Sequence, residues 1–282
     1  MALTLSDAVE TYLAELALIG RSPKTVKLQT DLLRLLVKGL EDGVRIGKIS
    51  RRDVTSYLAG MAERGLSQSY VGTNGKVIHR FFNWAVEQGI LKGNPLEGMT
   101  ITMGPDKPIA PFSDDECRRL IMAADTPFRR LVILLLLDTG MRASELCSLR
   151  LQDIDLVRGE IAIQGKGGRS RKVALNERPQ RALEEYLASK AQQDGLLWPE
   201  GWNRTNLTWV VDSVAHRAHV CCCHPHRFRH NWSVRLRRAG VDAIALQQLL
   251  GHSSLKMTMR YIAYCEGEHA VEVHRQHSVL PM

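Results

Sequence analysis

Residues 221–261 read CCCHPHRFRHNWSVRLRRAGVDAIALQQLLGHSSLKMTMRY, and this stretch concentrates charge and reactive side chains. The whole sequence has Lys+Arg 38 and Asp+Glu 30, which gives a formal net charge of +8. Between residues 221 and 260, seven arginines and lysines stand against one acid, Asp242, so most of the net charge lies here. A basic patch of this kind favours a polyanion such as nucleic acid over a neutral ligand.

Pro225 is expected to start a helix whose first turns carry His226 and Arg229 on one face. The free N–H groups and the dipole at such a helix N-terminus favour an anion as the ligand. A metal is the alternative, because Cys221–Cys223 lie beside several histidines. Zinc ligands usually come in pairs separated by two to four residues, whereas consecutive side chains project to different sides, so the metal site is the less favoured interpretation.

The end of the same stretch places a histidine and a tyrosine at a defined distance. Gly251 is expected to end a helix in a left-handed conformation, which fixes the direction in which His252 leaves it. Tyr261 follows nine residues after His252 on a further short helix. A tyrosine at this position is most often a packing residue, so the pair alone is compatible with either packing or chemistry.

Two other places set ionisable groups beside apolar segments. Arg142 follows the apolar run Leu131–Leu137 in TGMRASEL (139–146), and Glu145 lies three residues later. These two residues form either a surface ion pair or a rigidly supported arginine. Lys166 lies in the GKGG turn of a predicted β-hairpin. The turn lacks the G-x-x-x-x-G-K-[ST] spacing of a nucleotide-binding loop, which leaves a mobile lysine or a solvated hairpin tip.

The periodicity of apolar residues predicts a mainly α-helical chain with one small β-hairpin. Helix-capping residues and glycines predict a unit of four or five helices over residues 1–100. Residues 101–111 contain three prolines and are predicted to be an interdomain linker. Helices resume in residues 112–282, with the hairpin arms around residues 161–163 and 173–175.

Composition argues against several classes of protein. The most apolar run, residues 131–137, is far shorter than the roughly 20 residues that cross a bilayer, and the first residues lack the pattern of a secretory signal. The six cysteines show no regular disulfide spacing. We therefore expect a cytoplasmic protein with no membrane partner.

In their order and local frames, the motifs GMRASEL, QGKGGRSRKVAL, HRFRH and LGHSSLKMTMRY resemble those of the tyrosine recombinase, or phage integrase, superfamily. The resemblance extends over the whole chain. It implies a helical, SAM-like core-binding domain in residues 1–100, a linker in 101–111 and a catalytic domain in 112–282. Because the sequence starts directly in the core-binding domain, it is most similar to simple two-domain, Xer-like site-specific recombinases.

The resemblance implies that the DNA is cut and rejoined through a covalent intermediate. Arg142 and Arg229 would clamp the phosphate oxygens, since guanidinium groups keep their charge and bind two oxygens at once. Tyr261 would attack phosphorus to give a 3′-phosphotyrosine and a free 5′-hydroxyl, with Tyr264 as the alternative nucleophile. The phosphotyrosine stores the bond energy, so no metal or nucleotide cofactor is expected. Trp232 departs from the family pattern, which usually has a small residue there.

The other site residues receive supporting roles from the same resemblance. His226 is expected to accept the proton of the nucleophile, His252 to donate a hydrogen bond to the phosphate and Lys166 to protonate the departing 5′-oxygen. Glu145 is expected to orient Arg142. Contacts with DNA are expected from six further basic side chains: Arg169, Arg171, Lys172, Arg227, Lys256 and Arg260.

The implied partners are double-stranded DNA with a specific core site and further copies of the chain, as a dimer to tetramer on DNA. The tail after Tyr261, with Val271, Val273 and Leu280 as apolar residues, is expected to dock on a neighbouring protomer or to pack on its own domain. Integration, excision or resolution of mobile elements, in the cytoplasm at the nucleoid, is the expected role. The alternatives are a DNA-binding regulator that does not cut and a nicking-closing enzyme of the type IB topoisomerase kind.

Overall fold

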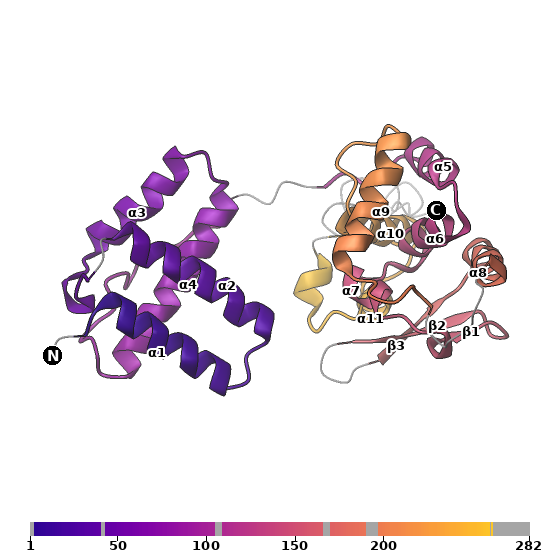
Figure 1. Ribbon diagram of the computed structural model, residues 1–282. Helices are drawn as coiled ribbons and strands as arrows, with labels where there is room; N and C mark the ends of the chain where they lie inside the picture. Colours follow the sequence, from indigo (N-terminus) through magenta and orange to yellow (C-terminus); the bar gives the residue numbers. More distant parts are fainter. Residues whose placement is uncertain are drawn as a thin grey trace, which may run out of the picture. The chain divides into compact units, whose positions relative to one another are not determined.

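The computed structural model describes residues 3–40, 43–104, 109–165, 170–189, 197–259 and 261. The chain divides into two compact units, residues 1–107 and 108–282, and this division falls inside the proline-containing segment 101–111. As predicted, the described residues are mainly helical with one small sheet (Figure 1). None of the described helices is both long enough and apolar enough to cross a membrane.

The described part of the first unit is built from four helices and a short 3-10 turn, η1 (Ile46–Lys48). The helices are α1 (Leu5–Leu18), α2 (Pro23–Gly39), α3 (Arg51–Glu63) and α4 (Gln68–Glu87). The hydroxyl of the N-cap residue of each helix accepts a backbone N–H of the first turn; these residues are Thr4, Ser22, Ser50 and Ser67 in turn. The apolar helix faces meet in one core.

Residues 101–104, at the start of the predicted linker, pack against α4. Gly72 allows this close approach, because a Cβ there would overlap the carbonyl oxygen of Thr102. Gly75 has the same effect one turn later, where a Cβ would lie 3.0 Å from the side chain of Ile101. These four residues therefore take part in the packing of the first unit.

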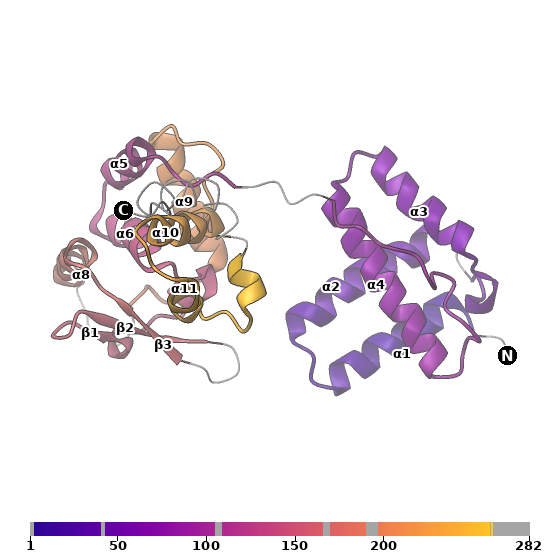
Figure 2. The ribbon, with the colours of Figure 1, turned by 180° about the vertical axis from the view of Figure 1, so that it is seen from behind.

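The second unit is organised around α6 (Pro127–Thr139), in which Leu131 to Leu136 are all buried, as the apolar run predicts. α10 (Pro225–Arg238) packs along α6, and the two helices lie side by side in both views (Figure 1, Figure 2). This packing brings the basic stretch of α10 close to the turn that follows α6. The remaining helices are α5 (Asp114–Ala123), α7 (Ala143–Cys147), α8 (Glu177–Ser189), α9 (Arg204–Arg217) and α11 (Ala243–Leu250).

A three-stranded antiparallel sheet completes the unit, in the order β1 (Ile154–Asp155), β2 (Glu160–Gln164) and β3 (Ser170–Ala174). The predicted hairpin is confirmed as β2 and β3, with Ile161 opposite Val173. β1 was not predicted, because two residues after the 3-10 turn η2 (Leu151–Asp153) are too short to show an alternating pattern. β3 lies against α11, so one strand of the sheet contacts the basic stretch of residues 221–260.

Candidate active site

The turn after α6 sets the position of Arg142. α6 ends at Gly140, whose left-handed conformation (φ 59°, ψ 17°) directs the chain into the N-terminus of α7. A Cβ at Gly140 would overlap the ring of Trp232, and the indole Nε1 of Trp232 donates to the carbonyl of Asp138 at 2.8 Å. Trp232, the residue that departs from the expected small side chain, therefore braces this turn. Arg142 occupies the N-cap of α7.

Glu145 is the centre of a cluster of three arginines. It accepts hydrogen bonds from Nη1 of Arg142 at 2.7 Å and from Nη1 and Nη2 of Arg171 at 2.9 and 2.8 Å, and Nη1 of Arg229 lies 3.9 Å away. Burial by itself raises the pKa of Glu145, but the hydrogen bonds from Arg171 and Arg142 outweigh it and lower the pKa to about 2. Glu145 is therefore ionised at neutral pH and holds the arginines together.

Arg229 lies on the face of α10 that points at this cluster, and only 2% of it is exposed. Its Nη1 donates to the carbonyl of Gly140 at 2.7 Å, and its Nη2 donates to the carbonyl of Leu250 at 2.6 Å. Burial, followed by the charge of Arg142, lowers the pKa of Arg229 to about 10. The guanidinium remains charged at neutral pH, in an orientation fixed by two backbone carbonyls.

His252 lies between Arg229 and a buried threonine. As predicted, Gly251 ends α11 in the left-handed conformation (φ 61°, ψ 44°). Nε2 of His252 lies 3.1 Å from Nη2 of Arg229, and Nδ1 lies 2.9 Å from Oγ1 of Thr258. A guanidinium can only donate, so Nε2 accepts and the proton is assigned to Nδ1, which donates to Thr258. Burial and the charges of Arg229 and Arg142 lower the pKa of His252 to about 4.

Tyr261 is stacked against His252 and is 4% exposed. The two ring centroids lie 6.0 Å apart with the planes at 13°, and the ring of His230 lies 5.4 Å away on α10. Trp232 and Leu250 belong to the same apolar cluster as Tyr261. Tyrosine, histidine and both arginines, far apart in the sequence, thus meet at one place.

An open groove of about 1540 Å³ runs over this place. Arg142, Arg171, Lys172 and His252 line it together with the exposed polar side chains of α11. Two arginines and a lysine along one groove suit a polyanionic backbone. Neither Tyr261 nor Arg229 lines the groove, because both lie buried beside His252.

A known sequence pattern covers most of this unit. The pattern described as the phage integrase family matches residues 112–267, more than half of the chain. The chain belongs to the phage integrase family. The tyrosine recombinase XerC of Oceanobacillus iheyensis is 30% identical over 261 residues, which cover 85% of this chain and 85% of that protein. The protein is therefore a site-specific DNA recombinase of the tyrosine type.

Other similar proteins cover both units of the recombinase. The tyrosine recombinase XerA of Thermococcus kodakarensis is 28% identical, over 91% of this chain and 90% of that protein. The Tn1549 transposon integrase, solved in complex with a circular intermediate DNA, matches with a TM-score of 0.77 at 20% identity, over 95% of this chain and 99% of that chain. A lambda integrase dimer bound to a COC′ core site matches with a TM-score of 0.77 at 18% identity, over 92% and 77%. These structures share the fold of the recombinase.

The remaining predicted site residues lie in several places. His226 is exposed on the first turn of α10, and Lys256 is exposed after α11. Lys172 is exposed on β3, where its Nζ pairs with Glu160 at 2.8 Å. Lys166, Arg169, Arg260, Tyr264 and the rest of the tail lie outside the described residues.

Arg171, for which a contact with DNA was predicted, lines the groove and is also held by protein groups. Its side chain is 9% exposed, and besides Glu145 it donates from Nε to the carbonyl of Leu249 at 2.7 Å. It joins β3 to α7 and to the end of α11. The alternation of β3 carries the signal that was missed, because Arg171 is two residues before Val173, whose side chain faces the core.

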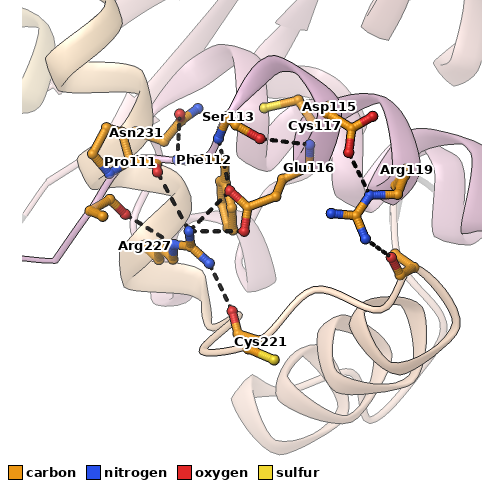
Figure 3. A network of polar contacts seen from close by, with 12 residues as sticks. Pro111, Phe112, Ser113, Asp115, Glu116, Cys117, Arg119, Cys221, Arg227 and Asn231 are labelled. Atoms are coloured by element: carbon orange, nitrogen blue, oxygen red, sulfur yellow. Dashed lines mark hydrogen bonds and ion pairs between the residues drawn. The ribbon is translucent and has the colours of Figure 1, made fainter.

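Arg227, for which a contact with DNA was also predicted, is buried at the N-terminus of α10 with Glu116 of α5 as its counter-ion (Figure 3). No local sequence pattern indicates this, since Arg227 and Glu116 are 111 positions apart. The neighbouring His224 caps α10, its Nδ1 accepting the N–H of Arg227 at 3.2 Å.

The cysteine run before α10 does not form a metal site within the described residues, where no three His, Cys, Asp or Glu side chains converge on one point. Cys221 and Cys222 are exposed, whereas Cys223 is buried in the core of the second unit. Burial raises the pKa of Cys223 to about 12, which keeps it a neutral thiol. The features of this region that suit an anion are therefore the backbone N–H groups at the start of α10 and Arg229.

Proposed function

We propose that the groove binds one scissile phosphodiester and that Tyr261 is the nucleophile that attacks it. The observation that carries this proposal is the convergence of Arg142 and Arg229 on Glu145. Nε2 of His252 lies 3.1 Å from Arg229, and the ring of His252 is stacked on the ring of Tyr261. Two permanently charged guanidiniums held by fixed acceptors can stabilise the charge that grows on the equatorial oxygens during in-line attack.

In the proposed reaction the Oη of Tyr261 forms a bond to phosphorus while the bond from phosphorus to the 5′-oxygen breaks. The phenolic proton passes to a base, for which His226 is the candidate, and the departing 5′-oxygen takes a proton from Lys166. The product is a 3′-phosphotyrosine and a free 5′-hydroxyl. Attack by the 5′-hydroxyl of another strand reverses these steps and regenerates the tyrosine. No redox partner or cofactor enters this balance.

Two local rearrangements follow from the geometry. Tyr261 is 4% exposed, so its hydroxyl must move toward the groove, and the short segment after Gly251 carries it. If His252 is to donate to the phosphate, its Nε2 must carry the proton and must bind a phosphate oxygen in place of Arg229. Thr258 supports either tautomer, because a hydroxyl can accept a hydrogen bond from Nδ1 or donate one to it.

We further propose that residues 1–100 form the core-binding domain, that residues 112–282 form the catalytic domain, and that the recombinase acts as a dimer to tetramer on a specific core site. Integration, excision or resolution of a mobile element in the cytoplasm, at the nucleoid, would use this activity. The DNA-bound integrases of similar fold support the DNA partner, and the lambda integrase dimer supports assembly on it.

A nicked duplex tests the nucleophile. The short fragment between the scissile phosphate and the nick, which carries the free 5′-hydroxyl, diffuses away after cleavage, so the covalent adduct accumulates and is scored by denaturing electrophoresis. The native chain should form an adduct with site-containing DNA, and Tyr261→Phe should form none. An adduct with Tyr261→Phe would exclude Tyr261 as the nucleophile. Binding without any adduct in the native chain would indicate a regulator, and cleavage indifferent to sequence would indicate a topoisomerase.

A further inference from the structure

One side of α10 forms hydrogen bonds with residues 110–114, which lie near the start of the second unit (Figure 3). Arg227, Asn231 and Arg235 are spaced four residues apart on this side, and each forms a hydrogen bond with that segment. Arg229, two residues after Arg227, lies on the side of the same helix that faces Glu145. One rigid helix thus links the chain that arrives from the first unit to the arginine of the site.

Arg227 makes the densest set of these contacts. Its Nε donates to the carbonyl of Ala110 at 3.0 Å, and its Nη1 donates to the carbonyl of Cys221 at 2.8 Å. Nη2 binds both carboxylate oxygens of Glu116, at 3.1 and 3.2 Å. The guanidinium also lies over the ring of Phe112, 4.1 Å from its centroid. The side chain is 9% exposed, so these protein groups satisfy most of its donors.

Asn231 and Arg235 continue the contact one and two turns later. Oδ1 of Asn231, a residue that is 1% exposed, accepts the backbone N–H of Phe112 at 3.1 Å and Nε of Arg235 at 3.1 Å. Arg235 reaches further, from Nη2 to Oδ1 of Asp114 at 2.6 Å. Glu116, the counter-ion of Arg227, also accepts the N–H of Ser113 as part of the N-terminal cap of α5. The segment is therefore held at several points along its backbone.

We propose that Arg227 is a positioning residue of the recombination reaction, which anchors the N-terminus of α10 to the 110–114 segment and so holds Arg229 at the phosphate. This inference rests on the proposed function, because it assigns Arg227 a role in the reaction of Tyr261. Arg227 does not touch the groove and is not expected to contact DNA. Its planar fork satisfies acceptors on three sides at once, which one ammonium group cannot do.

Arg119 provides a matched control on the same helix pair. It also ties α5 to the loop before α10, with Nη1 donating to the carbonyls of Ala218 and His219 at 2.8 and 2.9 Å (Figure 3). Unlike Arg227, Arg119 forms no hydrogen bond with α10 or with the 110–114 segment among the described residues. Replacing Arg119 therefore removes an arginine tether of α5 and leaves the anchor of Arg229 in place.

The experiment uses the full chain and measures two quantities separately: the Kd for a site-containing duplex and the single-turnover rate of adduct formation at saturating DNA. Arg227→Met should lower the rate by at least about tenfold, the scale of a small misplacement at a site of this kind, with the Kd changed less than about twofold. Arg227→Lys should recover part of the rate. Arg119→Met should stay within about twofold of the native rate.

Glu116→Gln serves as a second variant in case Arg227→Met does not fold, because the amide still accepts from Ser113 but no longer pairs its charge with Arg227. It should lower the rate by a few fold at unchanged Kd. An unchanged rate in the Arg227 and Glu116 variants, or an equal loss in Arg119→Met, would overturn the inference. Absence of any adduct in the native chain would instead refute the proposed function, so the two failures are distinguishable.

Discussion

Replacement of Glu145 by glutamine should destabilise the second unit by about 3 kcal/mol at neutral pH. The pKa of Glu145 is lowered from 4.5 to about 2, and at about 1.36 kcal/mol per pKa unit this difference corresponds to about 3 kcal/mol of stabilisation of the folded state. The same order of magnitude applies when one partner of a buried ion pair is removed and its counter-charges remain. Arg142 and Arg171 would then share a neutral acceptor.

The sign of the pH dependence follows from the lowered pKa. The stabilisation is complete above pH 4.5, where the unfolded glutamate is ionised, and is lost as pH falls toward 2, where Glu145 is protonated in the fold as well. A protonated glutamate resembles glutamine. The stability difference between the native chain and Glu145→Gln should therefore shrink from about 3 kcal/mol at pH 7 toward zero near pH 2.

Urea denaturation followed by tryptophan fluorescence measures this difference, because four of the five tryptophans lie in the second unit. Glu177→Gln is the control, since Glu177 pairs with Arg181 on the surface and both side chains are more than 70% exposed. Such a pair contributes about 0 to 1 kcal/mol. A Glu145→Gln variant as stable as the control at pH 7, or a gap that stays constant down to pH 2.5, would refute the reasoning.

Three further outcomes are expected. Gly140→Ala should destabilise the chain by more than about 2 kcal/mol in thermal denaturation, because left-handed strain adds to overlap with Trp232. Gly20→Ala has the same strain with open space around it and should cost only about 1 kcal/mol; equal losses would contradict the role of Trp232. Thr258→Val should slow adduct formation about tenfold at unchanged DNA affinity while Thr258→Ser preserves it, and an unaffected rate in the valine variant would exclude support of His252 by Thr258. His252 should titrate near pH 4 by NMR, with its signal assigned by comparison with His252→Asn, and a titration above pH 6 would contradict its burial beside Arg229. Because the pKa in the fold lies below the unfolded value of 6.5, the contribution of His252 to stability should be complete above pH 6.5 and lost as pH falls through 4.

Local patterns in the sequence predicted the helices well, because their signals lie within a few residues of each end. Pro225 does start α10 and Gly251 does end α11. Arg142 and Glu145 are three residues apart, so their ion pair could also be predicted from the local sequence. Each of these features is decided by neighbours in the chain.

The partners of Arg171 and Arg227 could not be read in this way, because they are set by tertiary packing. Arg171 reaches Glu145 across 26 positions and Arg227 reaches Glu116 across 111. Their positive charge favours an exposed position for both, yet both side chains are only 9% exposed and each pairs with a carboxylate. The alternation of β3 could have indicated that Arg171 faces the interior, whereas nothing near Arg227 in the sequence indicates its counter-ion.

The charges around the groove explain why the cluster is suited to a phosphodiester. Arg142, Arg171 and Arg229 bring three positive charges to Glu145, which supplies one negative charge, and His252 is neutral because its pKa is about 4. Among the side chains that the structure describes, this leaves an excess of two positive charges in a partly buried place, where electrostatic attraction is stronger than in water. A phosphodiester brings one negative charge, and further negative charge accumulates on its oxygens in the transition state. In the proposed reaction the cluster would therefore be better neutralised by the transition state than by the bound substrate, and such a difference accelerates a reaction.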